Sequence, residues 1–100
     1  MKILALEKEM PGLTNSDFKP HLEAEAQWVW ELQQSGIIRE IYFRRDQGSA
    51  VLVLECKSTS EAEAILSTLP LAQKGLVTFE IIPLKAYSGY SRLFRSRKTK

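Results

Sequence analysis

The chain has 100 residues, of which 44% are hydrophobic and 26% are charged, a length and composition that indicate one globular domain. Cys56 is its only cysteine and His21 its only histidine, which excludes an internal disulfide and a zinc site of the Cys/His type. No apolar run approaches the roughly 20 residues that a membrane span needs, and no signal-peptide pattern is present. We therefore expect a cytoplasmic protein that has no membrane partner and uses neither a metal nor an organic cofactor.

The net charge of +2 is unevenly distributed along the chain. Residues 85–100 contain six basic residues and no acidic one, whereas residues 1–84 contain eight basic and twelve acidic residues. We predict a domain over residues 1–85, followed over residues 86–100 by a C-terminal arm and basic tail. The acidic domain argues against a nucleic-acid partner.

The hydrophobic pattern predicts the element order β-α-β-β-α-β. This is the order of the ferredoxin-like α+β fold, in which two helices cover one face of a four-stranded antiparallel sheet. In chain order, we expect strands and helices over residues 2–8 (strand), 17–35 (helix), 37–45 and 50–56 (strands), 58–69 (helix) and 76–84 (strand).

Local signals set the ends of these elements. Asp17 or Ser16 is expected to cap the first helix, and Pro20 falls in its first turn, where a missing N–H costs little. Gly36 fits the left-handed position after that helix. Pro83 lacks a backbone donor, which predicts that the last strand lies at an edge of the sheet or leaves it there.

Both faces of the predicted sheet are apolar, which is unusual when one face is solvated. Alternation predicts that Ile41, Val51 and Val53 share one face, and that Tyr42, Leu52 and Leu54 share the other. We therefore expect a homodimer that stacks two sheets face to face, since an exposed second face would form a large apolar patch. The alternative is a monomer whose C-terminal tail folds over the open face.

With this order written out, the chain resembles the muconolactone isomerase family, which belongs to the dimeric α+β barrel proteins. The resemblance covers roughly residues 1–85, without gaps from Gly36 to Leu71. It depends on these residues: Leu32, Gln33, Gly36, Arg39, Tyr42, Ser58, Leu69-Pro70-Leu71 and Glu80. It implies the ferredoxin-like fold, a dimer through the sheet faces, larger rings of dimers and a cofactor-free proton shift within an unsaturated lactone.

This sequence departs from the family pattern in three places. The first helix carries Trp28 and Trp30, a short insertion precedes the last strand, and the C-terminal arm is different. The apolar residues of that arm predict that it packs on a second subunit or another dimer. These residues are Tyr87, Tyr90, Leu93 and Phe94. The departures bear most directly on the identity of the substrate.

Lactone isomerisation requires a base, a group that returns the proton, and donors that hold the enolate charge. Glu25 is the first candidate for the base, because its helical position places it partly within the apolar stripe and burial raises a carboxyl pKa. The alternative is a solvated or salt-bridged Glu25. Arg39, on a strand among apolar residues, needs an anion, either a ligand carboxylate or a protein partner such as Glu55 or Glu80.

Three further side chains are candidates for the site. His21 titrates near neutrality and could carry a proton, although it lies in the first turn of a helix, where exposure is common. The phenol of Tyr42 could donate to a ligand oxygen, or could pack at the interface. Trp28 could form the wall of an aromatic pocket, or could pack on its own sheet or a neighbouring subunit.

These observations leave three functions open. The first is a small cofactor-free isomerase or lyase in which Glu25 and Arg39 converge on one pocket. The second is a non-catalytic module of the same fold, which binds a small ligand or serves as an oligomeric scaffold. The third is a cofactor-free oxygenase, for which one histidine and few polar sheet residues give less support.

Overall fold

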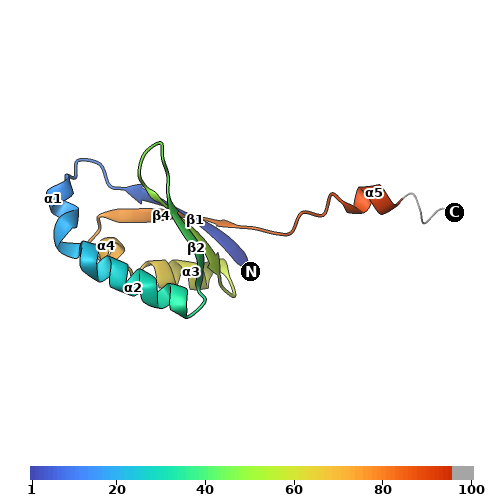
Figure 1. The fold of residues 1–100 in the computed structure, drawn as a ribbon, viewed down its shortest axis with the longest axis horizontal. Coiled ribbons are helices and arrows are strands. Elements are labelled where there is room, and N and C mark those ends of the chain that lie inside the picture. Colours follow the sequence, from blue (N-terminus) through green and yellow to red (C-terminus); the bar gives the residue numbers. More distant parts are fainter. Residues whose placement is uncertain (96–100) are drawn as a thin grey trace.

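A computed structural model describes residues 1–95 and confirms the α+β fold (Figure 1). The last part of the predicted basic tail, residues 96–100, lies outside the described residues. Among the described residues, no helix is long and apolar enough to cross a membrane. The elements in chain order are β1 (Lys2–Glu9), α1 (Asn15–Phe18), the 3-10 turn η1 (Lys19–His21), α2 (Leu22–Gln34), β2 (Ile38–Phe43), β3 (Ala50–Glu55), α3 (Thr59–Leu66), α4 (Pro70–Gln73), β4 (Val77–Pro83) and α5 (Ser91–Arg95).

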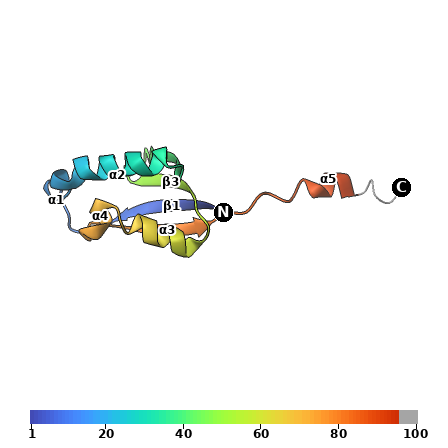
Figure 2. The ribbon, with the colours of Figure 1, turned by 90° about the horizontal axis from the view of Figure 1, so that it is seen from below.

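The four strands form one antiparallel sheet in the order β2-β3-β1-β4. The helices α2, α3 and α4 all lie on one side of this sheet (Figures 1 and 2). Strand β3 is central, as its continuous apolar run predicts, and β4 is an edge strand, as Pro83 predicts. Within residues 1–95, no helix covers the other face of the sheet.

The first predicted helix is divided into α1, η1 and α2. Pro20 lies in the 3-10 turn rather than in the first turn of one continuous helix, because its ring and missing N–H disfavour an unbroken α-helical ladder. The cap is also different from the prediction: Thr14 precedes the helix, and its N–H donates to Oδ2 of Asp17 at 2.7 Å. Gly36 follows α2 with φ of 85°, as predicted.

The second helical region is divided in the same way. Ser58 caps α3, and its Oγ accepts a hydrogen bond from the N–H of Glu61 at 3.1 Å. Helix α3 ends at Leu66 rather than at residue 69, and Pro70 begins the separate short helix α4, where a proline at the first position loses no helical hydrogen bond. The backbone N–H of Leu71, in the first turn of α4, donates to Glu25 of α2.

The predicted division of residues between the two faces was wrong. Ile41 lies opposite Leu52, and Tyr42 lies opposite Val51. A β-bulge between Ile38 and Glu40 places an extra residue in β2, and such an insertion reverses the alternation of every later side chain in the strand. Ile41 therefore shares the helix-covered face with Leu52, and Tyr42 shares the open face with Val51.

The core lies between the helices and one end of the sheet. Its largest fully buried side chains are Ile3, Ile38, Leu52, Leu54 and Leu69. Among the apolar residues of α2, only Leu32 is buried, whereas Leu22 is 50% exposed. The C-terminal half of α2 therefore packs on the sheet, while its N-terminal half faces an open space.

The C-terminal arm extends away from the body of the domain (Figure 1). Tyr87, Tyr90 and Leu93 are exposed by 70%, 66% and 64% of their surface. The rings of Tyr87 and Tyr90 contact each other edge to face, with 4.9 Å between their centroids. Within the described chain, this arm does not fold over the open face of the sheet. The structure therefore does not support a monomer in which the C-terminal tail covers that face.

Candidate functional site

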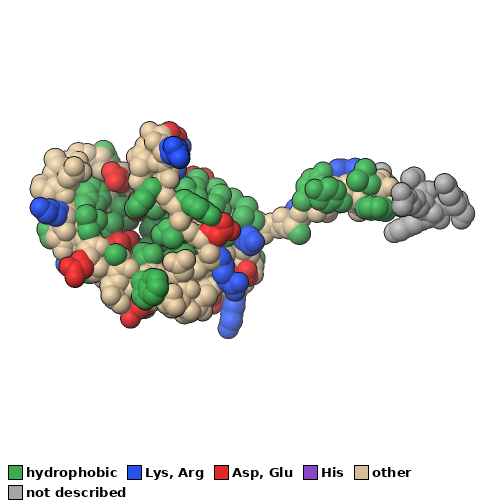
Figure 3. All heavy atoms as spheres, in the orientation of Figure 1, with side chains coloured by type: hydrophobic (Ala, Val, Ile, Leu, Met, Phe, Trp, Pro, Cys, Tyr) green, Lys and Arg blue, Asp and Glu red, His purple; other side chains and the backbone are tan. Residues whose placement is uncertain are grey.

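A groove of about 1090 Å³ lies beside α2, whose lining residues run from Leu22 to Gln33. Phe18, Leu22 and Val29 line one wall, from α1 and α2, while Ile41 and Phe43 of β2 line the other. Figure 3 shows hydrophobic side chains gathered around this hollow. Because its lining is mainly apolar, the groove suits a small organic ligand more than a hydrated ion.

Glu25 reaches this groove from α2 and is half-buried. Its Oε1 accepts a hydrogen bond from the backbone N–H of Leu71 at 3.0 Å. Leu71 lies in α4, directly after Pro70, and its N–H is one of the groups that a helix N-terminus leaves without an internal partner. The carboxylate therefore joins α2 to α4, and the prediction that Glu25 is partly buried is confirmed.

Glu7 lines the same groove from β1. Its Oε1 accepts a hydrogen bond from the N–H of Ala50, the first residue of β3, at 3.0 Å. The inward positions of β1 pass from the fully buried Ile3 and Ala5 to Glu7 and Glu9. The strand thus changes from apolar to acidic as it leaves the core and enters the groove.

The protein environment raises the pKa of both carboxyl groups. For Glu25, burial has the largest effect; the hydrogen bond from Leu71 opposes it and the negative charge of Glu7 adds to it. For Glu7, burial again has the largest effect, opposed by the hydrogen bond from Ala50 and assisted by the charge of Glu9. Raised carboxyl pKa values of this kind make both groups better suited to proton transfer near neutral pH.

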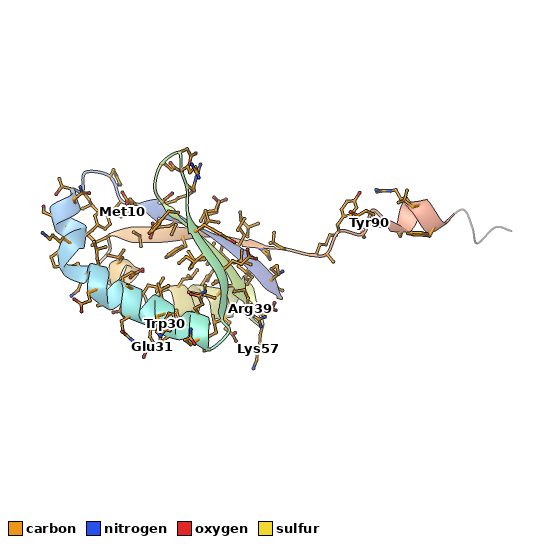
Figure 4. The ribbon with its side chains drawn as sticks, in the orientation of Figure 1. Met10, Trp30, Glu31, Arg39, Lys57 and Tyr90 are labelled. Carbon is orange, nitrogen blue, oxygen red and sulfur yellow. The ribbon has the colours of Figure 1, made fainter. Side chains whose placement is uncertain are left out.

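Arg39 is not among the residues that line the groove. Its side chain is exposed, near the start of β2 (Figure 4), and its Nε donates to the backbone oxygen of Gly36 at 2.5 Å. The N-terminal amine lowers the pKa of Glu55 by its hydrogen bond and its charge, desolvation opposes this, and the charge of Arg39 lowers the pKa further. Within the described chain, the structure does not bring Arg39 and Glu25 together in one pocket.

The other three candidates lie in different surroundings. Tyr42 lines the groove at the edge strand, and its hydroxyl donates to Oε1 of Glu40 at 2.8 Å. Trp28 packs against the core, and its Nε1 donates to Oγ1 of Thr68 at 2.7 Å. His21 is half-buried at the junction of η1 and α2 and does not line the groove. Only Tyr42 of these three therefore shares the groove with Glu25.

Two groove residues were not among the predicted site residues. Trp30 lines the groove while keeping 58% of its surface exposed, and Figure 4 shows it on α2. Glu7 of β1 is the other. The available signal was an acidic side chain at an inward position of β1, two residues after Ala5, because successive inward residues of a strand are two apart.

The groove offers two half-buried carboxylates and an apolar wall. Within residues 1–95, no group of three or more His, Cys, Asp or Glu side chains could hold a metal ion. Lys19 is the only basic side chain among the described residues that line the groove. The chemistry directly available is therefore proton transfer to and from an organic ligand.

Comparisons with known proteins agree with this description. Two solved structures have similar folds at 17% sequence identity. A 5-chloro-2-hydroxyhydroquinone dehydrochlorinase from Burkholderia phenoliruptrix AC1100, in complex with 2,5-dihydroxybenzoquinone, has a TM-score of 0.71 and is matched over 89% of this chain and 98% of its own. A muconolactone isomerase has a TM-score of 0.72 and is matched over 88% of this chain and 92% of its own.

A search of curated proteins found no match. Residues 5–89, however, match the family described as muconolactone delta-isomerase. That match spans β1 to β4 and therefore every element that lines the groove. The chain belongs to the muconolactone delta-isomerase family.

Proposed function

We propose that this protein is a cofactor-free isomerase that shifts a proton within a small unsaturated lactone or a related carboxylated compound. The observation that supports this most directly is Glu25, a half-buried carboxylate with a raised pKa in an apolar groove. Membership of the muconolactone delta-isomerase family is independent support for the reaction class. The specific substrate is the part of the proposal that most needs experiment.

In this proposal, Glu25 removes a proton from the carbon beside the lactone carbonyl. Oε1 is held by the N–H of Leu71, which fixes the carboxylate while Oε2 is directed to the ligand. The enolate that forms needs a hydrogen-bond donor. Tyr42 does not fill that role from its present position, because its side chain is on the open face of the sheet and its hydroxyl donates to Glu40. The donor must therefore come from another wall of the groove.

The test is turnover by Glu25→Gln against muconolactone and its uncharged methyl ester. Gln keeps an oxygen that can accept from Leu71, so the junction of α2 and α4 is retained while the base is lost. We expect the rate to fall by about 10²–10⁴-fold, the usual contribution of a positioned base. Glu31→Gln is the matched control, because Glu31 is exposed on the same helix (Figure 4). Unchanged turnover by Glu25→Gln would rule Glu25 out as the base.

A non-catalytic ligand-binding role is the second candidate, favoured by the mainly apolar lining of the groove. Calorimetry with 2,5-dihydroxybenzoquinone, the compound bound by the solved dehydrochlorinase, separates the two functions. A binding module would take up this compound equally well with and without the Glu25 carboxylate and would turn over neither lactone. An isomerase would turn over at least one lactone and would lose that activity in Glu25→Gln.

We also propose that the open sheet face pairs with a second copy of the chain. Half-buried apolar side chains occupy its centre, and polar side chains surround them. The apolar ones are Leu4, Leu6, Val51, Val53 and Ile82. Light scattering should give a dimer or a multiple of it, and Val53→Lys should lower the measured mass, because an unpaired charge would be buried at the centre of the interface. A monomeric wild type at micromolar concentration would contradict this assembly.

We assign a second contact between subunits to the C-terminal arm. Tyr87, Tyr90 and Leu93 extend from the domain and are largely exposed. We propose that they pack on the partner subunit or on another dimer. Removal of residues 86–100 should then reduce the mass of the assembly or its resistance to dilution, while the fold of residues 1–85 is retained.

A further inference from the structure

Glu7 is the charged side chain of this molecule that the fold explains least. It points to the helix-covered face of the sheet, where the preceding inward residues of β1, Ile3 and Ala5, are apolar and fully buried and the next one, Glu9, is exposed. A carboxylate at an inward strand position is desolvated, which disfavours its charged form. One hydrogen bond, from the N–H of Ala50, is its only bond within the described chain. A neutral side chain such as glutamine could accept this hydrogen bond equally well, so the bond alone does not explain a carboxylate at this position.

Glu7 and Glu25 are exposed to the same space. Both line the groove, one from the sheet and one from α2, and each gives a single oxygen to a backbone N–H. The second oxygen of each carboxylate makes no hydrogen bond to the described chain and is therefore available to a ligand. Two carboxylates in one apolar groove resist simultaneous ionisation, because the like charges repel.

The other charged groups near Glu7 do not offset this repulsion. Glu9 follows it on β1 and adds to the negative charge. Arg44 lines a smaller cavity of about 360 Å³ beside Glu7, but its guanidinium is bonded to Asp46 at 2.7 and 3.0 Å. Lys19 lies on the opposite wall of the main groove and is exposed. The pair therefore retains one proton more readily than either carboxylate would alone.

We propose that Glu7 is the second acid–base residue of this groove and returns the proton that the reaction removes. The proposal rests on the proposed isomerase function of Glu25. In the step, ionised Glu25 takes a proton from the carbon beside the carbonyl, and the electron pair of that C–H bond moves into the conjugated system. Protonated Glu7 then gives its proton to the far carbon of the same system. The product has the same atoms as the substrate.

At the end of this step, Glu25 holds the proton and Glu7 is ionised. Transfer of one proton from Glu25 to Glu7, directly or through water, restores the starting state. No oxidant, reductant or further reactant is required. The carbon that loses the proton and the carbon that gains it lie at different positions in the substrate. A single fixed carboxylate reaches one of them more readily than the other, whereas two carboxylates on different elements can reach one each.

The first test needs no substrate. Carbon-13 NMR of the glutamate carboxyl groups gives the titration midpoint of each residue in the wild type and in Glu7→Gln. Gln keeps an acceptor for the N–H of Ala50. We expect the midpoint of Glu25 to fall in Glu7→Gln and to stay in place in the control Glu31→Gln. An unchanged Glu25 midpoint in Glu7→Gln would show that the two carboxylates do not share a site, which overturns the proposal.

The second test uses whichever lactone the wild type turns over. Glu7→Gln should lower kcat by about 10²-fold or more, as for loss of a positioned acid, should leave KM nearly unchanged, and should remove one limb of the pH–rate profile. Full kcat in Glu7→Gln with an inactive Glu25→Gln would overturn the role of Glu7 and leave the isomerase function intact. Full kcat in both variants would overturn both.

Discussion

The two ends of the helix-covered sheet face differ in how they are built. At one end, Ile3, Ile38 and Leu54 are at most 1% exposed, beneath α3 and the C-terminal half of α2. At the other end, the same face carries Glu7 and Glu9 and opens into the groove. We infer that burial of apolar side chains at the first end supplies most of the stability of this domain. The other end can therefore accommodate the partly buried carboxylate of Glu7.

The largest contrast should appear in the free energy of unfolding. Leu54→Ala removes a fully buried side chain from the sealed end and should cost about 2–5 kcal/mol, the range for a core leucine. Leu22→Ala, at the open end where the side chain is 50% exposed, should change stability by about 0.5 kcal/mol or less. Urea unfolding of both variants is the measurement, and equal costs would contradict the contrast.

A smaller effect is expected at the junction between α2 and the segment after α3. Trp28→Phe keeps an aromatic ring in the core but loses the hydrogen bond to Oγ1 of Thr68. We expect a loss of about 0.5–1.5 kcal/mol, the net value of such a bond, with no change in ligand affinity. A variant with normal stability and weakened ligand binding would instead move Trp28 into the site.

The two carboxyl groups of the groove, Glu7 and Glu25, should make the stability of the domain depend on pH. Because the pKa values of Glu7 and Glu25 lie above the ordinary 4.5, the folded state binds more protons than the unfolded state between 4.5 and the raised values. Stability is therefore lost as pH rises through that window. Glu7→Gln should raise Tm at pH 7, and the advantage should disappear below about pH 4, where the unfolded carboxyl is also protonated. A Tm at pH 7 below that of the wild type would contradict the sign.

The smallest expected effect concerns Lys19, on the wall of the groove. If the substrate carries a carboxylate, Lys19→Gln should raise KM for muconolactone by about five-fold at most, as for an exposed ion pair. KM for the uncharged methyl ester should not change. Equal effects on the acid and the ester would mean that Lys19 contributes to the shape of the groove rather than to charge recognition.

The order of elements, the central position of β3 and the turn at Gly36 were predictable from the sequence. These features depend on hydrophobic period and on local backbone preferences, which act over a few residues. The partial burial of Glu25 was also predictable, because helical spacing alone places it at the edge of the apolar stripe.

Only the tertiary structure decided which apolar residues are buried and which line a groove. The bulge in β2 reversed the faces of Ile41 and Tyr42, and the break at Pro20 leaves Leu22 and Val29 beside an open space. The structure also separated Arg39 from Glu25 and brought Glu7 to the same groove instead. The physical reason is that periodicity defines a face of an element, whereas what covers that face depends on the register and tilt of elements far apart in the chain.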